Sequence, residues 1–207
     1  MENYKQIFLK LSPDIYTFAQ NSGQALQQIK GGSPVIQFRA KNLPDHIAEK
    51  KATEIITTVR EFPDTIVVLN DFVDLAVKLN APGIHVGQDT DYKYLIRNLP
   101  DSMIIGVSVD TIEEAVEAER AGATYLGAGA VFKTATKPEA PAIGTEQLEK
   151  IVQAVSIPVV AIGGINLNNI SEVIKTGARF FAVISSINNS PDIENEVRKF
   201  RNKIKLK

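Results

Sequence analysis

Short apolar runs rich in β-forming residues recur at fairly even spacing along this chain of 207 residues. Segments between them have the periodicity of amphipathic helices. The clearest is Ile112–Ala121, which follows the cap candidates Asp110 and Thr111 and ends before Gly122. This alternation predicts βα units, and therefore a parallel sheet. We expect strands at residues 7–11, 34–38, 65–69, 83–86, 103–107, 124–127, 157–162 and 179–184, and a second clear helix at 145–155.

The strands are predicted to be covered on both faces. Residues 157–162, for example, are apolar at successive positions, as in buried parallel strands. Evenly spaced strands of this kind predict an α/β fold, a single (β/α)8 TIM barrel that residues 1–207 form as one domain. The alternative is an open α/β sheet of six to eight strands.

The composition excludes several classes of partner and site. The 23 Lys and Arg nearly balance the 24 Asp and Glu, which argues against nucleic acid as the main partner. Cysteine is absent and there are only two histidines, so disulfides, thiolate sites and a His-rich zinc site are not expected. No signal peptide or membrane-spanning run is apparent. We expect a cytoplasmic protein without a membrane partner, and a homo-oligomer stays open.

In such a barrel, functional side chains lie where each strand ends. After the second predicted strand, Gln37, Arg39 and Lys41 alternate and therefore face one side of an extended segment. The Arg fork and the Lys charge both suit phosphate oxygens, although a solvated rim is the simpler alternative.

Acidic residues follow the next two strands. Asp71 can be a magnesium ligand that shares the metal with substrate phosphates, or Asn70 and Asp71 can cap a helix. Asp89 and Asp91 reach the same rim after the fourth strand, and in an extended segment they would face one side and Thr90 the other. Solvated loop carboxylates are the alternative.

Two polar residues near the strand ends have a structural and a functional interpretation. His85 lies between apolar neighbours and is more typical of a hydrogen-bonded core residue than of a catalyst. Ser108, after the fifth strand, can donate its hydroxyl to a phosphate or cap the next helix.

The loop at residues 127–144 is long for a compact barrel, and such loops are commonly functional. Its Thr134, Thr136 and Lys137 combine hydroxyl groups with a cation, a composition suited to closing over pyrophosphate.

The last two junctions predict a phosphate site built from backbone. Gly163 and Gly164 end the seventh strand, and Ser185 and Ser186 follow the eighth, where barrels of this kind commonly bind phosphate. Backbone amides can surround a phosphate without a charged side chain. A tight turn that needs positive φ is the alternative for the glycines.

Taken in order, these motifs resemble thiamine phosphate synthases and the related thiazole tautomerases, over about residues 34–200. They are Gln37-Phe-Arg-Ala-Lys41, Asn70-Asp71, Gly83-Ile-His-Val-Gly-Gln88, Ile105-Gly-Val-Ser108, Gly127-Ala-Gly-Ala-Val-Phe-Lys-Thr-Ala-Thr-Lys137, Val160-Ala-Ile-Gly-Gly-Ile165 and Val183-Ile-Ser-Ser186.

The resemblance implies a transferase, a thiamine-phosphate diphosphorylase, that joins hydroxymethylpyrimidine diphosphate to thiazole phosphate and releases pyrophosphate. It implies a dissociative step in which magnesium and cations stabilise the departing pyrophosphate, before the thiazole nitrogen attacks a pyrimidine carbocation.

The resemblance also implies a role for each matching residue. The pyrophosphate side would comprise Arg39, Lys41, Asn70, Ser108 and Lys137, with Arg39, Ser108 and Lys137 as the catalytic candidates. Gln37 is a further substrate-binding candidate with no side assigned. Thr134 and Thr136 would line the thiazole side, Gly164, Ile184 and Ser185 would bind the thiazole phosphate, and Asp71 and Asp89 are the candidates for Mg²⁺.

Three positions depart from the family pattern. Thr90 stands where the second acidic metal ligand is usual, Lys133 stands where proline is usual, and residues 8–14 lack the usual Thr-Asp end of the first strand. Two further interpretations therefore stay open: a paralogue similar to thiazole tautomerase, and a non-catalytic binder of a phosphorylated metabolite. The tautomerase pattern has a histidine where this chain has Asp110.

Overall fold

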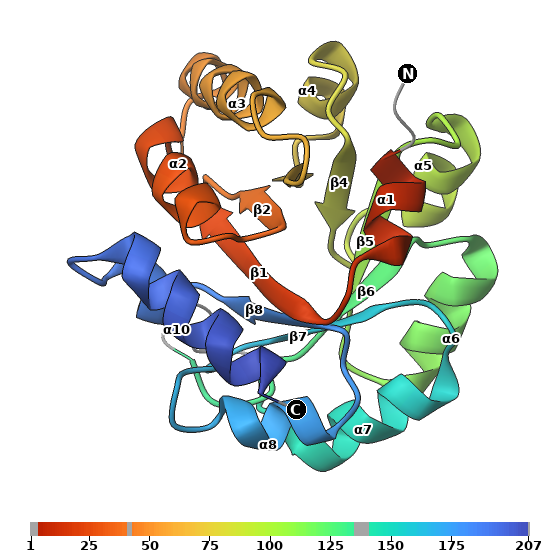
Figure 1. Cartoon of the computed structure of the whole chain (residues 1–207). Helices are drawn as coiled ribbons and strands as arrows, with labels where there is room; N and C mark the ends of the chain where they lie inside the picture. Colours follow the sequence, from red (N-terminus) through yellow and green to blue (C-terminus); the bar gives the residue numbers. More distant parts are fainter. Residues whose placement is uncertain (1–3, 41–42, 135–140, 207) are drawn as a thin grey trace.

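The structure, a computed structural model, describes residues 4–40, 43–134 and 141–206. Eight parallel strands form a closed barrel in the order of the sequence, with β8 paired back to β1. Figure 1 shows most of the helices around the outside of these strands. The predicted (β/α)8 barrel is confirmed. The strands are β1 (Asp14–Ala19), β2 (Val35–Phe38), β3 (Ile66–Asn70), β4 (Gly83–Val86), β5 (Ile104–Val109), β6 (Tyr125–Ala128), β7 (Val159–Ile162) and β8 (Phe180–Val183).

Local capping signals predicted both ends of one helix correctly, and the helix predicted at residues 145–155 is observed one residue earlier, as α7 (Gly144–Ala154). Helix α6 spans Ile112–Ala121, with a capping box at Thr111 and a left-handed Gly122 (φ 103°) after its last turn. Within the described ranges, no helix is both long and apolar enough to cross a bilayer. The other helices are α1 (Tyr4–Lys10), α2 (Ser22–Lys30), α3 (Asp45–Arg60), α4 (Val73–Lys78), α5 (Tyr92–Asn98), α7 (Gly144–Ala154), α8 (Ile170–Lys175), α9 (Ser185–Asn188) and α10 (Ile193–Lys205).

The predicted first strand at residues 7–11 is wrong. That segment lies in α1, whose only buried residue is Phe8, whereas all six residues of β1 are buried. The strand β1 was missed because it begins with a charged residue, Asp14, whereas the prediction relied on apolar runs. Its carboxylate is buried in an ion pair with Arg201 of α10, at 2.7 Å. The other seven predicted strands overlap observed ones.

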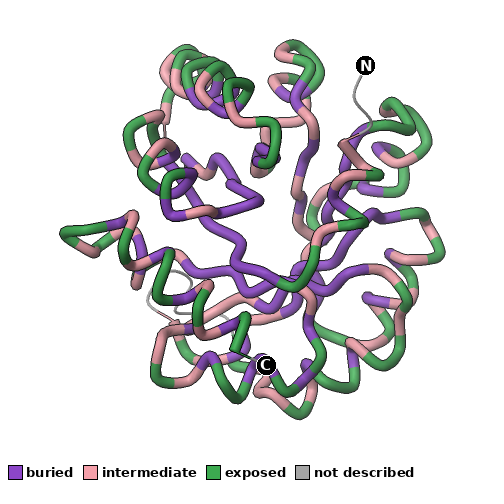
Figure 2. The backbone as a smooth tube through the Cα atoms, in the orientation of Figure 1, coloured by how far each residue is buried: buried purple, intermediate pink, exposed green. Residues whose placement is uncertain are grey.

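Two apolar layers lie on the two faces of the barrel. One fills the space between strands and helices, and the other fills the barrel interior. Most strand residues are therefore buried (Figure 2), and the partly exposed ones lie toward the C-terminal ends of β3, β4, β5 and β7. Phe8 of α1 belongs to the inner layer, with its ring centroid 5.1 Å from those of Tyr125 and Phe180. Since Phe180 is the first residue of β8, α1 closes the barrel at the end opposite the C-terminal strand ends.

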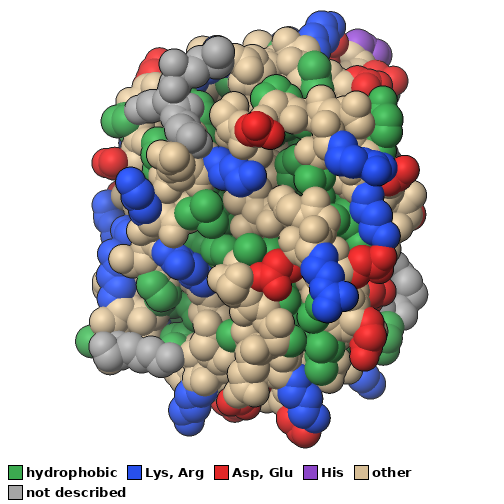
Figure 3. All heavy atoms as spheres, turned by 90° about the vertical axis from the view of Figure 1, so that its right-hand side faces the viewer, with side chains coloured by type: hydrophobic (Ala, Val, Ile, Leu, Met, Phe, Trp, Pro, Cys, Tyr) green, Lys and Arg blue, Asp and Glu red, His purple; other side chains and the backbone are tan. Residues whose placement is uncertain are grey.

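The outer surface carries charges of both signs. Figure 3 shows basic and acidic side chains interspersed over one face of the molecule. Lys93 of α5 forms an ion pair with Glu117 of α6. Exposed pairs of this kind contribute little to stability.

The role of Phe8 as a plug can be tested by truncation. Phe8→Ala should lower the free energy of unfolding by about 3–5 kcal/mol, because it empties a fully buried aromatic site. The neighbouring Leu9, which is 38% exposed, offers a matched control, and Leu9→Ala should change stability far less. Urea denaturation followed by circular dichroism measures both. Equal effects of the two variants would contradict the proposed closure by α1.

Candidate active site

A pocket of about 500 Å³ lies at the C-terminal ends of the barrel strands. Most of the predicted site residues line it. Lys41, Thr136 and Lys137 lie outside the described residues, so their predicted roles stay predictions. The predicted residues that line the pocket are Gln37, Arg39, Asn70, Asp71, Asp89, Ser108, Thr134, Gly164, Ile184 and Ser185.

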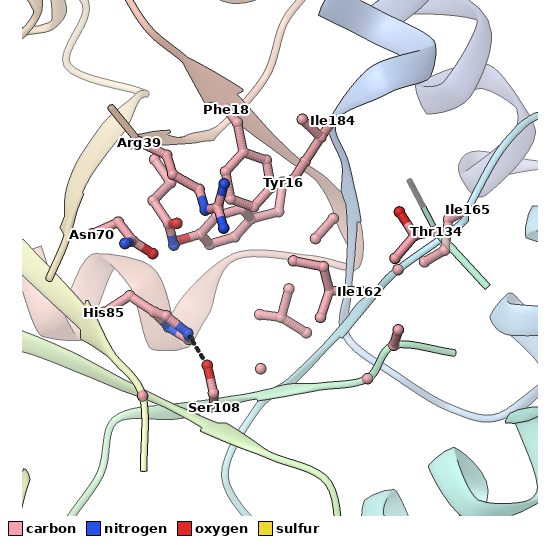
Figure 4. A pocket seen from close by; sticks show the side chains of 18 of the residues that line it. Tyr16, Phe18, Arg39, Asn70, His85, Ser108, Thr134, Ile162, Ile165 and Ile184 are labelled. Atoms are coloured by element: carbon pink, nitrogen blue, oxygen red, sulfur yellow. Dashed lines mark hydrogen bonds between the residues drawn. The ribbon is translucent and has the colours of Figure 1, made fainter. Parts of the chain in front are cut away.

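One side of the pocket is polar and charged. Arg39 and Asn70 project into it from the ends of β2 and β3 (Figure 4). Asp71 has a left-handed backbone (φ 63°), its N–H donates to the carbonyl of His85 at 2.9 Å, and its carboxylate accepts from the amide of Asn70. Burial lowers the pKa of Arg39, and the negative charge of Asp71 opposes this shift. The charge of Asp71 thus helps to keep the guanidinium protonated.

The acidic loop after β4 folds differently from the expected extended segment. The N–H of Thr90 donates to the carbonyl of Gly87 at 3.3 Å, so the chain turns there. Asp89 lines the pocket, whereas the carboxylate of Asp91 accepts from the N–H of Tyr94 at 2.9 Å and caps α5. The expectation that Asp89 and Asp91 face the same side is therefore wrong. Asp89 is the carboxylate of this loop at the pocket, and Thr90 is not among the lining residues.

The floor of the pocket contains a continuous chain of hydrogen bonds. His85 Nε2 lies 2.9 Å from Ser108 Oγ (Figure 4), and His85 Nδ1 lies 2.9 Å from the hydroxyl of Tyr125. That hydroxyl is 2.9 Å from the hydroxyl of Tyr16, which accepts from the amide of Gln37 at 3.0 Å. Five strands thus contribute one member each to the chain, from β2 through β1, β6 and β4 to β5.

Two glycines leave the space that the rings of this hydrogen-bonded network occupy. A Cβ atom at Gly106 would lie 2.1 Å from the ring of Tyr125 and 2.5 Å from His85 Nδ1. A Cβ atom at Gly127 would lie 2.8 Å from His85 Cε1. These glycines inside predicted strands were the available signal for a large polar neighbour. Tyr16 and Tyr125 were missed, Tyr16 because β1 itself was missed.

Burial keeps the titratable residues of this hydrogen-bonded network neutral. It lowers the pKa of His85 to about 4, and the positive charge of Arg39 acts in the same direction. Burial raises the pKa of Tyr16 and that of Tyr125 far above the ordinary tyrosine value. Around neutral pH the hydrogen-bonded network therefore contains an uncharged imidazole and two uncharged phenols.

The loops after β6 and β7 pack closely on each other. The N–H groups of Val131 and Phe132 donate to the carbonyls of Ile162 and Gly163, at 2.8 and 3.1 Å. Gly163 and Gly164 have φ of 104° and 66°, and a Cβ atom at Gly164 would lie 2.7 Å from the carbonyl oxygen of Lys133. The turn interpretation of the two glycines is thus confirmed, and they also permit close contact between the two loops.

The same glycine turn leaves backbone donors at the pocket. Among the described residues, no acceptor is found for the N–H of Gly164 or that of Ser185, and both residues line the pocket. The adjoining wall is apolar, with Phe18, Ile162 and Ile184 projecting into the space shown in Figure 4. The pocket thus combines a charged side, backbone donors and an apolar wall.

The fold and this pocket define the class: a (β/α)8-barrel protein whose pocket at the C-terminal strand ends is lined by charged side chains, backbone donors and an apolar wall. Residues 14–187 match the family model described as thiamine monophosphate synthase. The chain belongs to the thiamine monophosphate synthase family.

Individual relatives agree with this assignment. The thiamine-phosphate synthase of Pyrococcus furiosus is 41% identical over 175 residues, 84% of each chain. That of Clostridium acetobutylicum is 42% identical over 83% of this chain and 82% of its own. A solved structure of thiamine phosphate pyrophosphorylase from Pyrococcus furiosus has a TM-score of 0.86 and 36% identity, covering 94% of this chain and 96% of that one.

The neutral His85 predicts a pH dependence of stability. The unfolded chain should bind a proton at the ordinary histidine pKa of 6.5, whereas the folded chain binds it only near 4. The unfolded state therefore gains protons first as the pH falls from 6.5 to 4, and the free energy of unfolding should fall by up to about 3 kcal/mol.

Urea denaturation at a series of pH values measures this decrease. His85→Gln should remove the part of the decrease that comes from this residue. His46→Gln, at an exposed position of α3, should retain it. If the His85→Gln protein kept the full dependence between pH 6.5 and 4, the neutral state of His85 would not be its source.

Proposed function

We propose that this chain is a thiamine-phosphate synthase, which joins hydroxymethylpyrimidine diphosphate to thiazole phosphate and releases pyrophosphate. The observation that carries the proposal is a single pocket with charged groups on β2–β4 and backbone donors with an apolar wall on β7 and β8. Such a pocket suits two phosphorylated ring compounds, one held at each side. The sequence similarity to thiamine-phosphate synthases covers most of the chain, at 41–42% identity.

We assign the diphosphate to the charged side. Arg39 would pair with its oxygens, with Asn70 and Ser108 as neutral donors. Negative charge builds up on the leaving pyrophosphate as its bond to the pyrimidine methylene breaks, so a fixed cation acts most strongly in the transition state. Lys41 and Lys137, predicted from the sequence to serve the same group, would add to this charge.

We assign the thiazole phosphate to the side formed by β7 and β8. The N–H groups of Gly164 and Ser185 would donate to its oxygens. Ile184 would contact the thiazole, and Thr134 and Thr136 would complete that side. In this arrangement the thiazole nitrogen would face the pyrimidine methylene carbon.

The residues present are suited to Mg²⁺. Asp71 and Asp89 come from neighbouring loops and line the same pocket. Magnesium commonly takes one or two protein carboxylates and completes its shell with substrate phosphates and water. The described part of the chain has no cluster of three or more His, Cys, Asp or Glu for a metal. When bound, the ion would neutralise charge on the diphosphate.

A product assay with both phosphorylated substrates tests the proposal. Thiamine phosphate and pyrophosphate should form in equal amounts, and only when Mg²⁺ and both substrates are present. Binding of thiazole phosphate without any product would favour the non-catalytic binder. Isomerisation of the thiazole phosphate alone would favour an enzyme similar to thiazole tautomerase.

The two carboxylates can be tested against a third one in the same loop. Asp71→Asn and Asp89→Asn should each raise the Mg²⁺ concentration required for half-maximal turnover by at least about tenfold, because each removes a charged ligand. Asp91→Asn is the matched control, since Asn can also cap α5 and Asp91 faces that helix. Equal effects of Asp89→Asn and Asp91→Asn would show that Asp89 is not a ligand.

A further inference from the structure

The chain of hydrogen bonds in the pocket floor has a direction, because each member has a limited number of protons. It starts at the Gln37 side-chain amide nitrogen, which can only donate, and which donates to the Tyr16 hydroxyl. Tyr16 is 0% exposed and its hydroxyl has one proton. Its other partner is the hydroxyl of Tyr125, so the proton of Tyr16 points to Tyr125.

The remaining hydrogen bonds, from Tyr125 to Ser108, have the same direction. The Tyr125 hydroxyl accepts from Tyr16, so its own proton points to His85 Nδ1 at 2.9 Å. A neutral imidazole has one N–H, and when Nδ1 accepts, that N–H is at Nε2. His85 Nε2 therefore donates to Ser108 Oγ, at 2.9 Å. The hydroxyl proton of Ser108 is then left for another acceptor.

We propose that Gln37, Tyr16, Tyr125 and His85 form a directional relay that holds His85 in its Nε2–H tautomer and makes Ser108 a hydrogen-bond donor to the substrate. Ser108 lines the pocket, and the acceptor of its proton is an oxygen of the bound diphosphate, an identification that rests on the proposed function. Tyr16, Tyr125 and His85 are positioning residues. Ser108 is the member that touches the substrate.

Two features of the barrel support the relay. The directed contacts require a neutral imidazole, because a protonated ring would direct a second N–H at a Tyr125 hydroxyl that already donates. Gly106 and Gly127 leave room for the two rings, so that His85 stacks on Tyr125 with centroids 5.4 Å apart. The geometry thus favours both the contacts and the protonation state that the relay requires.

The tautomer can be measured directly in the free protein by NMR with ¹⁵N-labelled histidine. The chain has only two histidines, and His46→Gln assigns the signals. We expect a protonated Nε2 and an unprotonated Nδ1 for His85. A predominant Nδ1–H tautomer would overturn the proposal, whether or not the protein makes thiamine phosphate.

A single substitution should reverse the relay. In Gln37→Glu, an ionised carboxylate accepts where the amide donated, so Tyr16, Tyr125 and His85 Nδ1 should each donate the other way, and Ser108 should donate to His85 Nε2. With the pH raised until the new carboxyl group ionises, His85 should change to its Nδ1–H tautomer. The control Gln24→Glu lies outside the pocket at a side chain that already accepts, from the N–H of Gln20, and should leave the tautomer unchanged. An unchanged tautomer in the ionised Gln37→Glu protein would also overturn the proposal.

A double-mutant cycle tests whether the relay acts through Ser108. Ser108→Ala and Tyr125→Phe should each lower kcat on the order of 10- to 100-fold, as expected for a lost hydrogen bond to a charged group. Because both remove the same interaction, the double variant should be no worse than Ser108→Ala. Additive losses would show that Tyr125 acts independently of Ser108. If Tyr125→Phe does not fold, Tyr16→Phe takes its place in the cycle.

Discussion

The interior of an eight-stranded barrel has room for only a few layers of side chains, and the rest of this structure depends on how that space is filled. At the closed end the filling is apolar, with Phe8 and Phe180 in contact. Toward the open end, Tyr16, Gln37, His85 and Tyr125 bring polar atoms into the same restricted space. Burying a polar group without a partner is costly, so these groups must bond to one another. Because each of these groups needs a partner, they form one connected hydrogen-bonded network, which is the floor of the pocket.

That floor separates the deep core from the charged rim. Arg39 and Asp71 lie at the rim, where substrate charge can reach them, while burial keeps the imidazole below them neutral. On the far side, the glycine turn after β7 positions backbone donors without a charged side chain. Under the proposed function, the barrel would therefore hold its two phosphorylated substrates in two different ways.

Sequence patterns predicted the parts of this site that follow from local rules. Alternation at the strand ends located Arg39 and Gln37, and capping chemistry located Thr111 and Gly122. β1 was missed because its first residue, Asp14, is an acid buried by an ion pair with a residue far along the chain, which no local pattern reveals.

The orientation of Asp91 and the hydrogen-bonded network also depend on tertiary structure that local patterns do not reveal. The turn after Gly87 separates Asp89 from Asp91, although an extended segment would align them. The relay joins side chains from five strands, and its members become neighbours only when the barrel closes. The sequence singled out Gln37, His85 and Ser108 separately, and the glycines at inward positions of β5 and β6 were the signal for the missed tyrosines.

A crystal structure of the protein with thiamine phosphate and pyrophosphate bound would test the division of the pocket most directly. Pyrophosphate should lie against Arg39 and Ser108, and the phosphate of thiamine phosphate should accept from the N–H groups of Gly164 and Ser185. The opposite placement, or both phosphate groups bound on one side of the pocket, would contradict the assignment of the two sides.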